Sequence, residues 1–360
     1  MLLVMTKQQT PRQEPAGFYS SLYAMIADVA TQDERGAEVL SRRLGVMGRP
    51  PATLHEVGLE LGLSRERVRQ LQSRAVSRIA IPVAVKDVFT EFVATLPYSA
   101  DRPFAYGSER LSPERLVSTA GVLGVALDVH VSDVAGQSLW VRRGTGPMVR
   151  SAARRINDTL SRVVAGRRKA LVDYVADGLP PHAVSRGELD RLLDQLPVRQ
   201  VAGWVLLSHP APGCPFLLAL KRMLCLSESG LAWPDVWRGL QRSARRGRSG
   251  LLQHDGVPPD EVGMALCEAS DELVWEEGAV LSQTPLLEAS QLPPMELAWV
   301  RAIRDGIDQR RMLLEIASGL GYRENTAESC LATSPVVVPA GDGRYRLVSQ
   351  SSDDAVTGGS

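Results

Sequence analysis

The apolar positions between residues 64 and 79 recur with the spacing of an α-helix. Val68, Leu71, Ala75 and Ile79 lie three or four residues apart, so a helix would place all four on one face. Ser64 precedes the pattern and is a residue type that caps helix N-termini. The opposite face would be polar and carries Arg65, Glu66, Arg67, Arg69, Gln70, Gln72, Arg74 and Arg78. We therefore predict a helix over residues 64–79 with one buried face.

A shorter helix is predicted immediately upstream. Thr53 is a good N-cap, and Glu56 three residues later completes a capping-box pattern. The apolar positions of this helix are Leu54, Val57, Leu59 and Leu61. Gly62 then allows the chain to turn at little steric cost. Two short helices, the second rich in arginine and glutamine, are typical of a helix-turn-helix that reads the DNA major groove. A plain helix pair with a solvated charged face is the alternative.

Further helices and hairpins are predicted downstream. Residues 83–96 have helical spacing, and Ser112-Pro113 is typical of a helix start. Residues 127–131 alternate between apolar and polar before a turn at Ala135-Gly136, which predicts a hairpin. A helix followed by a hairpin indicates a winged-helix module that ends near residue 143.

The C-terminal part repeats this order. Two helices are predicted over residues 312–320 and 325–331. Asp342-Gly343 lies between two apolar runs, which is a strong sign of a hairpin. A second winged helix is therefore expected before residue 349, although no clean sequence repeat links the two modules.

Charge is distributed unevenly although the total is zero, with 41 basic and 41 acidic residues. Residues 142–169 contain nine Arg or Lys and one acid, Asp158, on a predicted amphipathic helix. That helix could contact DNA phosphates, or its basic face could simply be solvated. No Lys or Arg lies between Arg248 and Arg301, where acids accumulate. This stretch would repel DNA; it could meet a basic protein surface, fold against the arginine clusters, or be solvated.

Neither catalysis nor a bound group is predicted. The sequence contains no GxxxxGK[ST], HExxH or GxSxG motif, and no acidic cluster with metal-ligand spacing. The four cysteines are scattered and form no CxxC pair, so we expect reduced thiols. No apolar stretch reaches membrane-spanning length, and the first residues do not form a signal peptide. We expect a cytoplasmic protein without cofactor or metal that is not an enzyme.

The identities of the residues in this region make the helix-turn-helix prediction more specific. Residues 35–79, which include RRLGVMG and TLHEVGLELGLSRERVRQLQSRAVSRI, closely resemble region 4 of bacterial sigma-70 family factors. Helices that pack beneath the helix-turn-helix in that family extend the resemblance back to about Phe18. The resemblance implies recognition of a promoter element in double-stranded DNA and contact with the β-subunit flap of RNA polymerase.

The resemblance also implies roles for individual residues. Arg65, Glu66 and Gln70 match the positions that reach base edges. The positions that match phosphate contacts are Thr53, Arg67, Arg69 and Arg74. Arginine suits guanine, glutamate accepts from cytosine and glutamine addresses adenine. Phosphate contacts would set the register and give binding its salt dependence.

Two functions of different class follow. No segment resembles sigma region 2, so we expect that the protein does not open promoters alone. The first candidate is a sequence-specific transcription regulator or partial sigma-like factor. The second is a DNA-anchoring scaffold subunit of a larger assembly, such as a defence or repair complex, with no role in transcription initiation. The C-terminal half could bind a protein partner under either function.

The predicted fold class is mainly α, with a sigma region 4-like helix-turn-helix followed by tandem helical or winged-helix modules with short β-hairpins. The predicted divisions are a mobile tail over 1–17, the helix-turn-helix domain over 18–82, a winged-helix module over 83–147, a helical module with basic clusters over 148–250, an acidic helical segment and a winged helix over 251–349, and a disordered tail over 350–360.

Overall fold

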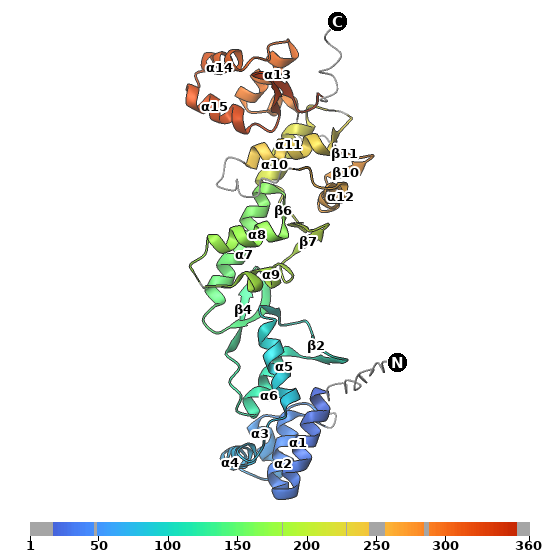
Figure 1. Cartoon of the computed structure of the whole chain (residues 1–360), viewed down its shortest axis with the longest axis vertical. Helices are drawn as coiled ribbons and strands as arrows, with labels where there is room; N and C mark the ends of the chain where they lie inside the picture. The colour runs from blue at the N-terminus through green and yellow to red at the C-terminus, as the bar shows by residue number, and fades with distance from the viewer. Residues whose placement is uncertain are drawn as a thin grey trace, which may run out of the picture. The chain divides into compact units, whose positions relative to one another are not determined.

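The computed structural model describes residues 17–46, 49–181, 183–227, 229–244, 256–283 and 288–350. These residues form two compact units, Met1–Gly146 (unit 1) and Pro147–Ser360 (unit 2). Apart from Gly17 and Gln350, both predicted tails lie outside the described residues. The fold is mainly α with short antiparallel sheets, which confirms the predicted fold class (Figure 1).

Unit 1 begins with four helices: α1 Phe18–Gln32, α2 Glu34–Leu44, α3 Leu54–Leu61 and α4 Arg65–Val76. The α3–α4 pair is the predicted helix-turn-helix. Gly62 adopts the left-handed conformation (φ 63°) that lets the chain turn without a Cβ clash. Gly58 is also required, because a Cβ there would lie 2.7 Å from the Leu63 carbonyl oxygen. The two helices therefore pack closely around small residues.

Two details of the helix-turn-helix differ from the prediction. The α4 helix ends at Val76, because the Arg78 and Ile79 N–H groups donate to carbonyls three residues earlier and tighten the last turn. Leu59 is 71% exposed, so it does not belong to the apolar face of α3. The core beneath the pair is formed by Val39, Val57, Val68 and Leu71.

The rest of unit 1 is module A, defined as residues 83–143. It contains α5 Val83–Ala94, β1 Tyr98–Ser99, β2 Phe104–Tyr106, β3 Glu109–Leu111, α6 Pro113–Val122, β4 Val129–Val134 and β5 Gln137–Arg142. Its sheet has the order β1-β5-β4, with antiparallel neighbours. This is the winged-helix arrangement, with the β2–β3 hairpin between the first strand and the last helix.

A single core joins module A to α1–α4, so the boundary expected between residues 82 and 83 does not separate two cores. The Phe18 and Phe89 rings meet edge to face, with centroids 6.0 Å apart. Glu109 of module A caps α1, where its Oε2 accepts the Phe18 N–H at 2.7 Å. These contacts join residues about 70 and 90 positions apart, which local sequence patterns cannot reveal. The folding unit is therefore longer than the helix-turn-helix itself.

Unit 2 contains three modules with the order helix, strand, helix, helix and hairpin. Module B (residues 146–207) contains α7 Gly146–Val163, β6 Ala165–Arg167, α8 Arg168–Asp177, α9 Arg186–Leu193, β7 Val198–Val201 and β8 Trp204–Leu207. Module C (residues 215–282) contains α10 Pro215–Leu224, β9 Leu231–Ala232, α11 Trp233–Ala244, α12 Asp260–Glu268, β10 Leu273–Glu276 and β11 Ala279–Ser282.

Module D (residues 294–347) follows a short 3₁₀ helix, η2 Ala289–Gln291. It contains α13 Pro294–Arg304, α14 Arg310–Gly319, α15 Glu324–Thr333, β12 Val337–Gly341 and β13 Arg344–Leu347. Its first strand is reduced to one bridge, between Gln309 and Arg344. In modules B and C the strand orders are β6-β8-β7 and β9-β11-β10. All three modules thus have the winged-helix order in which the last strand lies in the centre of the sheet.

The sheets correct two predicted divisions. Residues 148–250 are not only helical, because they contain the whole β6-β8-β7 sheet. The division at 250/251 cuts module C, in which Leu231 pairs with Val280. The first strands of these two sheets, β6 and β9, have only three and two residues and are too short to show alternation, so the sequence pattern did not reveal them.

The three modules of unit 2 share one apolar cluster. Trp204 of module B packs edge to face on Trp237 of module C, with centroids 5.5 Å apart. A partly buried ion pair connects module C to module D, since Arg222 Nη2 lies 3.1 Å from Oε1 of the buried Glu296. Trp204, Trp233 and Trp237 are all buried, as predicted.

Candidate nucleic-acid interface

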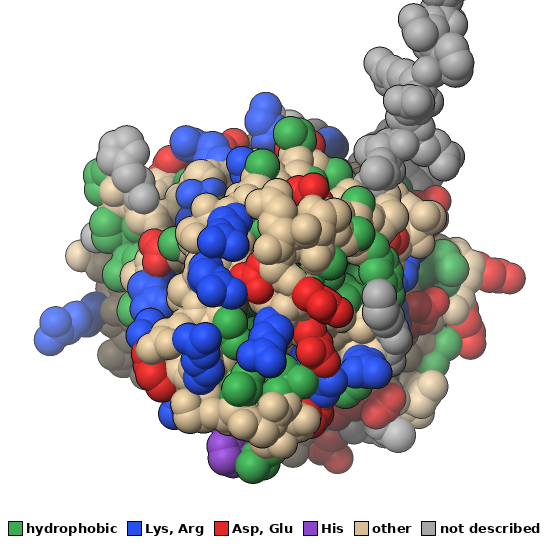
Figure 2. All heavy atoms as spheres, turned by 90° about the horizontal axis from the view of Figure 1, so that it is seen from below, with side chains coloured by type: hydrophobic (Ala, Val, Ile, Leu, Met, Phe, Trp, Pro, Cys, Tyr) green, Lys and Arg blue, Asp and Glu red, His purple; other side chains and the backbone are tan. Residues whose placement is uncertain are grey.

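The N-terminal half of α4 is the most exposed polar helix face in the helix-turn-helix. The Ser64 hydroxyl caps the helix by accepting the Arg67 N–H at 3.2 Å. The exposed residues in this half are Arg65, Glu66, Arg67, Arg69 and Gln70. Figure 2 views the end at which Figure 1 draws α1–α4 and shows basic side chains with acidic ones among them. All three predicted base-reading residues therefore lie on one accessible surface.

Glu66 organises its neighbours on this surface. Its two carboxylate oxygens accept from Arg69 Nε at 2.8 Å and Nη2 at 2.7 Å. Gln70 Nε2 donates to the same carboxylate at 3.4 Å, and Arg67 Nη1 donates to Gln70 Oε1 at 3.3 Å. The hydrogen bond from Arg69 is the main reason that the pKa of Glu66 is lowered. Glu66 is thus held as a carboxylate, the form that can accept a hydrogen bond from cytosine.

The start of α3 contributes backbone and hydroxyl groups. Thr53 Oγ1 accepts the Glu56 N–H at 3.2 Å, and Glu56 Oε2 accepts the Thr53 N–H at 2.6 Å, so the predicted capping box is present. The Thr53 hydroxyl keeps its own proton, which it can donate to a phosphate oxygen. The helix dipole also favours an anion at this end.

Arg74 and Gln72 do not extend freely from α4. Arg74 Nε and Nη2 lie 2.9 and 2.8 Å from Oδ2 of the buried Asp33. Gln72 is half-buried: it accepts from Arg43 Nε at 3.1 Å and donates to the Val122 carbonyl at 3.0 Å. The sequence pattern placed both residues on the polar face of α4, but the partners of both lie far away in the sequence. Gln72 therefore belongs to the contact between α4 and module A.

The corresponding helices of the other modules differ from α4. The last helix before the hairpin is α6 in module A, α9 in module B, α12 in module C and α15 in module D. The α6 helix packs against α2, where Arg115 donates to the Gly45 carbonyl and covers the Tyr19 ring at 4.8 Å. This contact covers part of the surface with which α6 would read DNA.

The arginines of module B near α9 are paired with acids. Arg186, at the start of α9, lies 2.7 Å from Asp173 and 3.0 Å from Asp177. Arg168 binds both Asp190 and Asp194 of the α9 segment. These pairs neutralise positive charge that a phosphate backbone would need.

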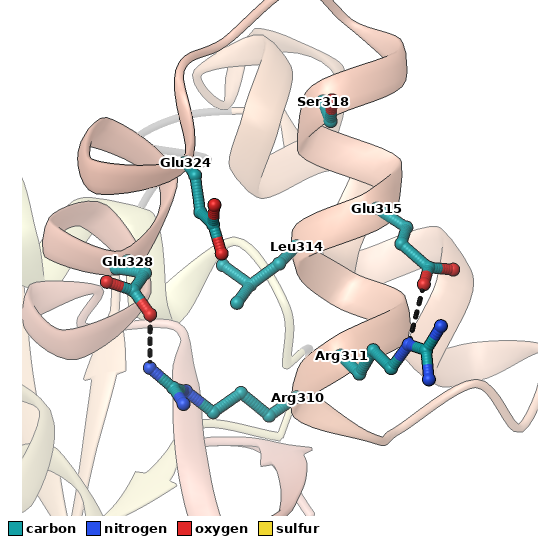
Figure 3. Close-up of a pocket in the computed structure, with 7 residues that line it drawn as sticks. All are labelled: Arg310, Arg311, Leu314, Glu315, Ser318, Glu324 and Glu328. Carbon is teal, nitrogen blue, oxygen red and sulfur yellow. Dashed lines mark hydrogen bonds and ion pairs between the residues drawn. The ribbon is translucent and has the colours of Figure 1, made fainter.

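Module D has a surface hollow between α14 and α15 (Figure 3). Its two arginines form ion pairs across or along the hollow: Arg310 lies 2.5 Å from Glu328, and Arg311 lies 2.9 Å from Glu315. Glu324 and Leu314 point toward each other between them (Figure 3). The charges that line the hollow are therefore paired, and the hollow is not a basic site for a phosphate.

Comparison with protein families agrees with the geometry of α3 and α4. The family model described as sigma-70, region 4 matches residues 31–80. Residues 31–80 are a sigma-70 region 4 segment. The match starts three residues before α2 and ends four residues after α4, so it covers the helix-turn-helix and one supporting helix. No solved structure matches the chain.

The region 4 segment indicates DNA binding through a helix-turn-helix. Sequence reasoning found its polar face but missed Asp33, Glu109 and Arg115, whose partners lie 41, 91 and 70 residues away. In the described part of the chain, no group of three His, Cys, Asp or Glu side chains could hold a metal ion. No helix of the described residues is long and apolar enough to cross a bilayer.

Proposed function

We propose that the protein is a sequence-specific DNA-binding transcription regulator, or partial sigma-like factor, that reads promoter-type duplex DNA with α4. The observation that carries this proposal is the exposed N-terminal half of α4, held on a capped helix-turn-helix within the region 4 segment. In helix-turn-helix proteins this half of the second helix contacts base edges.

The proposed roles divide along the surface. Arg65, Glu66 and Gln70 read bases, while Thr53, Arg67 and Arg69 contact phosphates. Arg69 already pairs with Glu66, so a phosphate contact requires Arg69 to share its donors between the two anions. The network that links Glu66, Arg69 and Gln70 in the free protein supports a surface organised before DNA arrives.

Region 4 also suggests contact with the β flap of RNA polymerase, and we include polymerase binding in the proposal. The second candidate is a DNA-anchoring scaffold that binds protein partners through unit 2. Modules B, C and D favour this second candidate, because their last helices are acidic or have arginines that are already paired with acids. Copurification from the native cells separates the two: polymerase recovered in amounts near one to one supports a transcription role, and its absence supports the scaffold. We expect no enzymatic activity in either case.

Base reading is tested by selecting preferred sites from random duplex DNA with the full chain. Arg65→Ala and Gln70→Ala should each cost about 1–3 kcal/mol of binding free energy and relax the preference at one base pair. Arg67→Ala is the matched control on the same helix and should weaken binding to all DNA sequences alike. If Arg65→Ala and Gln70→Ala keep the wild-type preference, α4 does not read the bases as proposed.

A further inference from the structure

Asp33 is a buried carboxylate that receives hydrogen bonds from two helices. It is only 7% exposed and precedes α2. Its Oδ1 accepts the Gly36 N–H at 2.9 Å and thereby caps α2. Its Oδ2 accepts from Arg74 Nε and Nη2 of α4, and Arg78 Nη1 lies 3.9 Å away. One carboxylate therefore ties the start of α2 to the C-terminal half of α4.

The two helices approach closely at this point. A Cβ on Gly36 would lie 3.0 Å from the Ala75 Cβ and 2.8 Å from the Asp33 carboxylate. Ala75 is fully buried and neighbours Arg74 in sequence. The contact allows little sliding of α4 over α2, and the ion pair sits at its edge. Arg74 is one helical turn beyond Gln70, so a change in its position would tilt the base-reading half of α4.

We infer that Asp33 and Arg74 are positioning residues that set the angle of α4, and that Arg74 is not a phosphate contact. The inference rests on the proposed DNA-reading function of α4. Moving Arg74 to a phosphate would take two N–H donors away from Oδ2 of a buried carboxylate, which is unfavourable. The phosphate role that the family resemblance implies for Arg74 is thereby replaced by a role in the contact between α4 and α2, in which the Arg74 side chain stays 48% exposed.

The inference is tested in the full chain with Asp33→Asn, Arg74→Ala and the double variant. Asparagine is also a good N-cap, so Asp33→Asn keeps the α2 cap and removes only the charge. Arg67→Ala is the control for a phosphate contact. Affinity for the selected duplex is measured at several salt concentrations, and folding is checked by thermal unfolding.

A positioning pair gives a specific result. Each single variant should weaken binding about tenfold. The affinity of the double variant should lie within about twofold of the single variants, because each single substitution already removes the same interaction. The slope of log affinity against log salt should stay unchanged in Arg74→Ala and fall by about one in Arg67→Ala. A phosphate role for Arg74 would overturn the inference: Arg74→Ala would then lower the slope, and Asp33→Asn would tighten binding by freeing the guanidinium.

A second measurement does not depend on DNA. Amide hydrogen exchange in the free protein should accelerate along α4 in both Asp33→Asn and Arg74→Ala, but not in Arg67→Ala. If the wild-type chain bound no duplex, the proposed function would fail while this measurement still tested the pair. Unchanged exchange along α4 in both variants would overturn the positioning role.

Discussion

The α4 helix of unit 1 and the α12 helix of module C have comparable places but opposite surfaces. Each is the second of two successive helices, and each has one buried face. The exposed face of α4 carries four arginines in its first ten residues. The α12 helix contains no Lys or Arg, and its exposed face is formed by Asp260, Glu261, Met264 and Glu268. The shared helical arrangement therefore does not determine the partner.

The surroundings of α12 strengthen this difference. Its hairpin carries the exposed Glu276 and Glu277, and Met264 on the helix is 42% exposed. Arg199 of module B neutralises only Glu268, at 2.6 Å. A phosphate backbone would be repelled by this surface. Function thus depends on the residues placed on the fold rather than on the fold itself.

A test of charge reversal should produce the largest effect. Replacing Arg65 and Arg67 of α4 together by glutamate should reduce the affinity of the full chain for duplex DNA by at least about 100-fold, because base and phosphate contacts both become repulsive. The matched variant replaces Asp260 and Glu261 of α12 by lysine. It should leave the preferred site unchanged and raise weak, non-specific binding only a few-fold. Affinities of both variants are measured by fluorescence anisotropy at one salt concentration.

Two outcomes would break the comparison. If DNA binding survived the reversal on α4, another surface would carry it. If the lysines on α12 created binding as strong as that of α4, charge alone would account for the difference and the geometry of the region 4 segment would be incidental.

A smaller effect is expected at the contact between α6 and α2. Arg115→Ala removes the hydrogen bond to the Gly45 carbonyl and the stacking on Tyr19. We expect unit 1 to lose about 1–3 kcal/mol of stability, since the Gly45 carbonyl is buried. The preferred DNA site should stay the same, because the proposed base-reading residues all lie on α4. Pulse proteolysis in urea measures the stability, and site selection measures the preference. A changed preference would show that α6 takes part in reading.

Local signals explain how much of the fold could be predicted. Thr53, Ser64 and Gly62 mark helix ends by their own chemistry, and all three have the predicted roles. The Asp342-Gly343 turn likewise lies in the predicted C-terminal hairpin. In each case the residues that decide the conformation are neighbours in sequence, so a single sequence is sufficient.

Long-range contacts explain what could not be predicted. The strands β6 and β9 form only because partners 37 to 49 residues away supply their hydrogen bonds. The pairing of Asp33 with Arg74 likewise joins positions far apart, and nothing in either residue's neighbourhood indicates it. The polar face of α4 was therefore predictable as a surface, whereas the structure was needed to show that Arg74 on this face pairs with Asp33.

The smallest effect should be a pH dependence in the stability of unit 1 that comes from the Asp33 contact. The Gly36 N–H, followed by the Arg74 guanidinium, lowers the pKa of Asp33 in the folded protein. A carboxyl group whose pKa is lower when folded contributes stability above its unfolded pKa of about 4, and this contribution disappears as the pH falls through the folded value. Wild-type unit 1 should therefore lose stability below about pH 4, whereas Asp33→Asn removes the titrating group.

The stability difference between wild type and Asp33→Asn should accordingly be largest near neutral pH and should shrink on acidification. Urea midpoints at about pH 7, 5 and 3.5 measure it, with pulse proteolysis and mass spectrometry used to assign the cleaved peptides to unit 1. Asp87→Asn on α5, an exposed residue of the same unit, serves as the control and should leave the pH profile close to that of the wild type. A difference that stayed constant from pH 7 to 3.5 would mean that the Asp33 charge does not stabilise unit 1. The ion pair with Arg74 would then have no energetic role in holding α4 on α2.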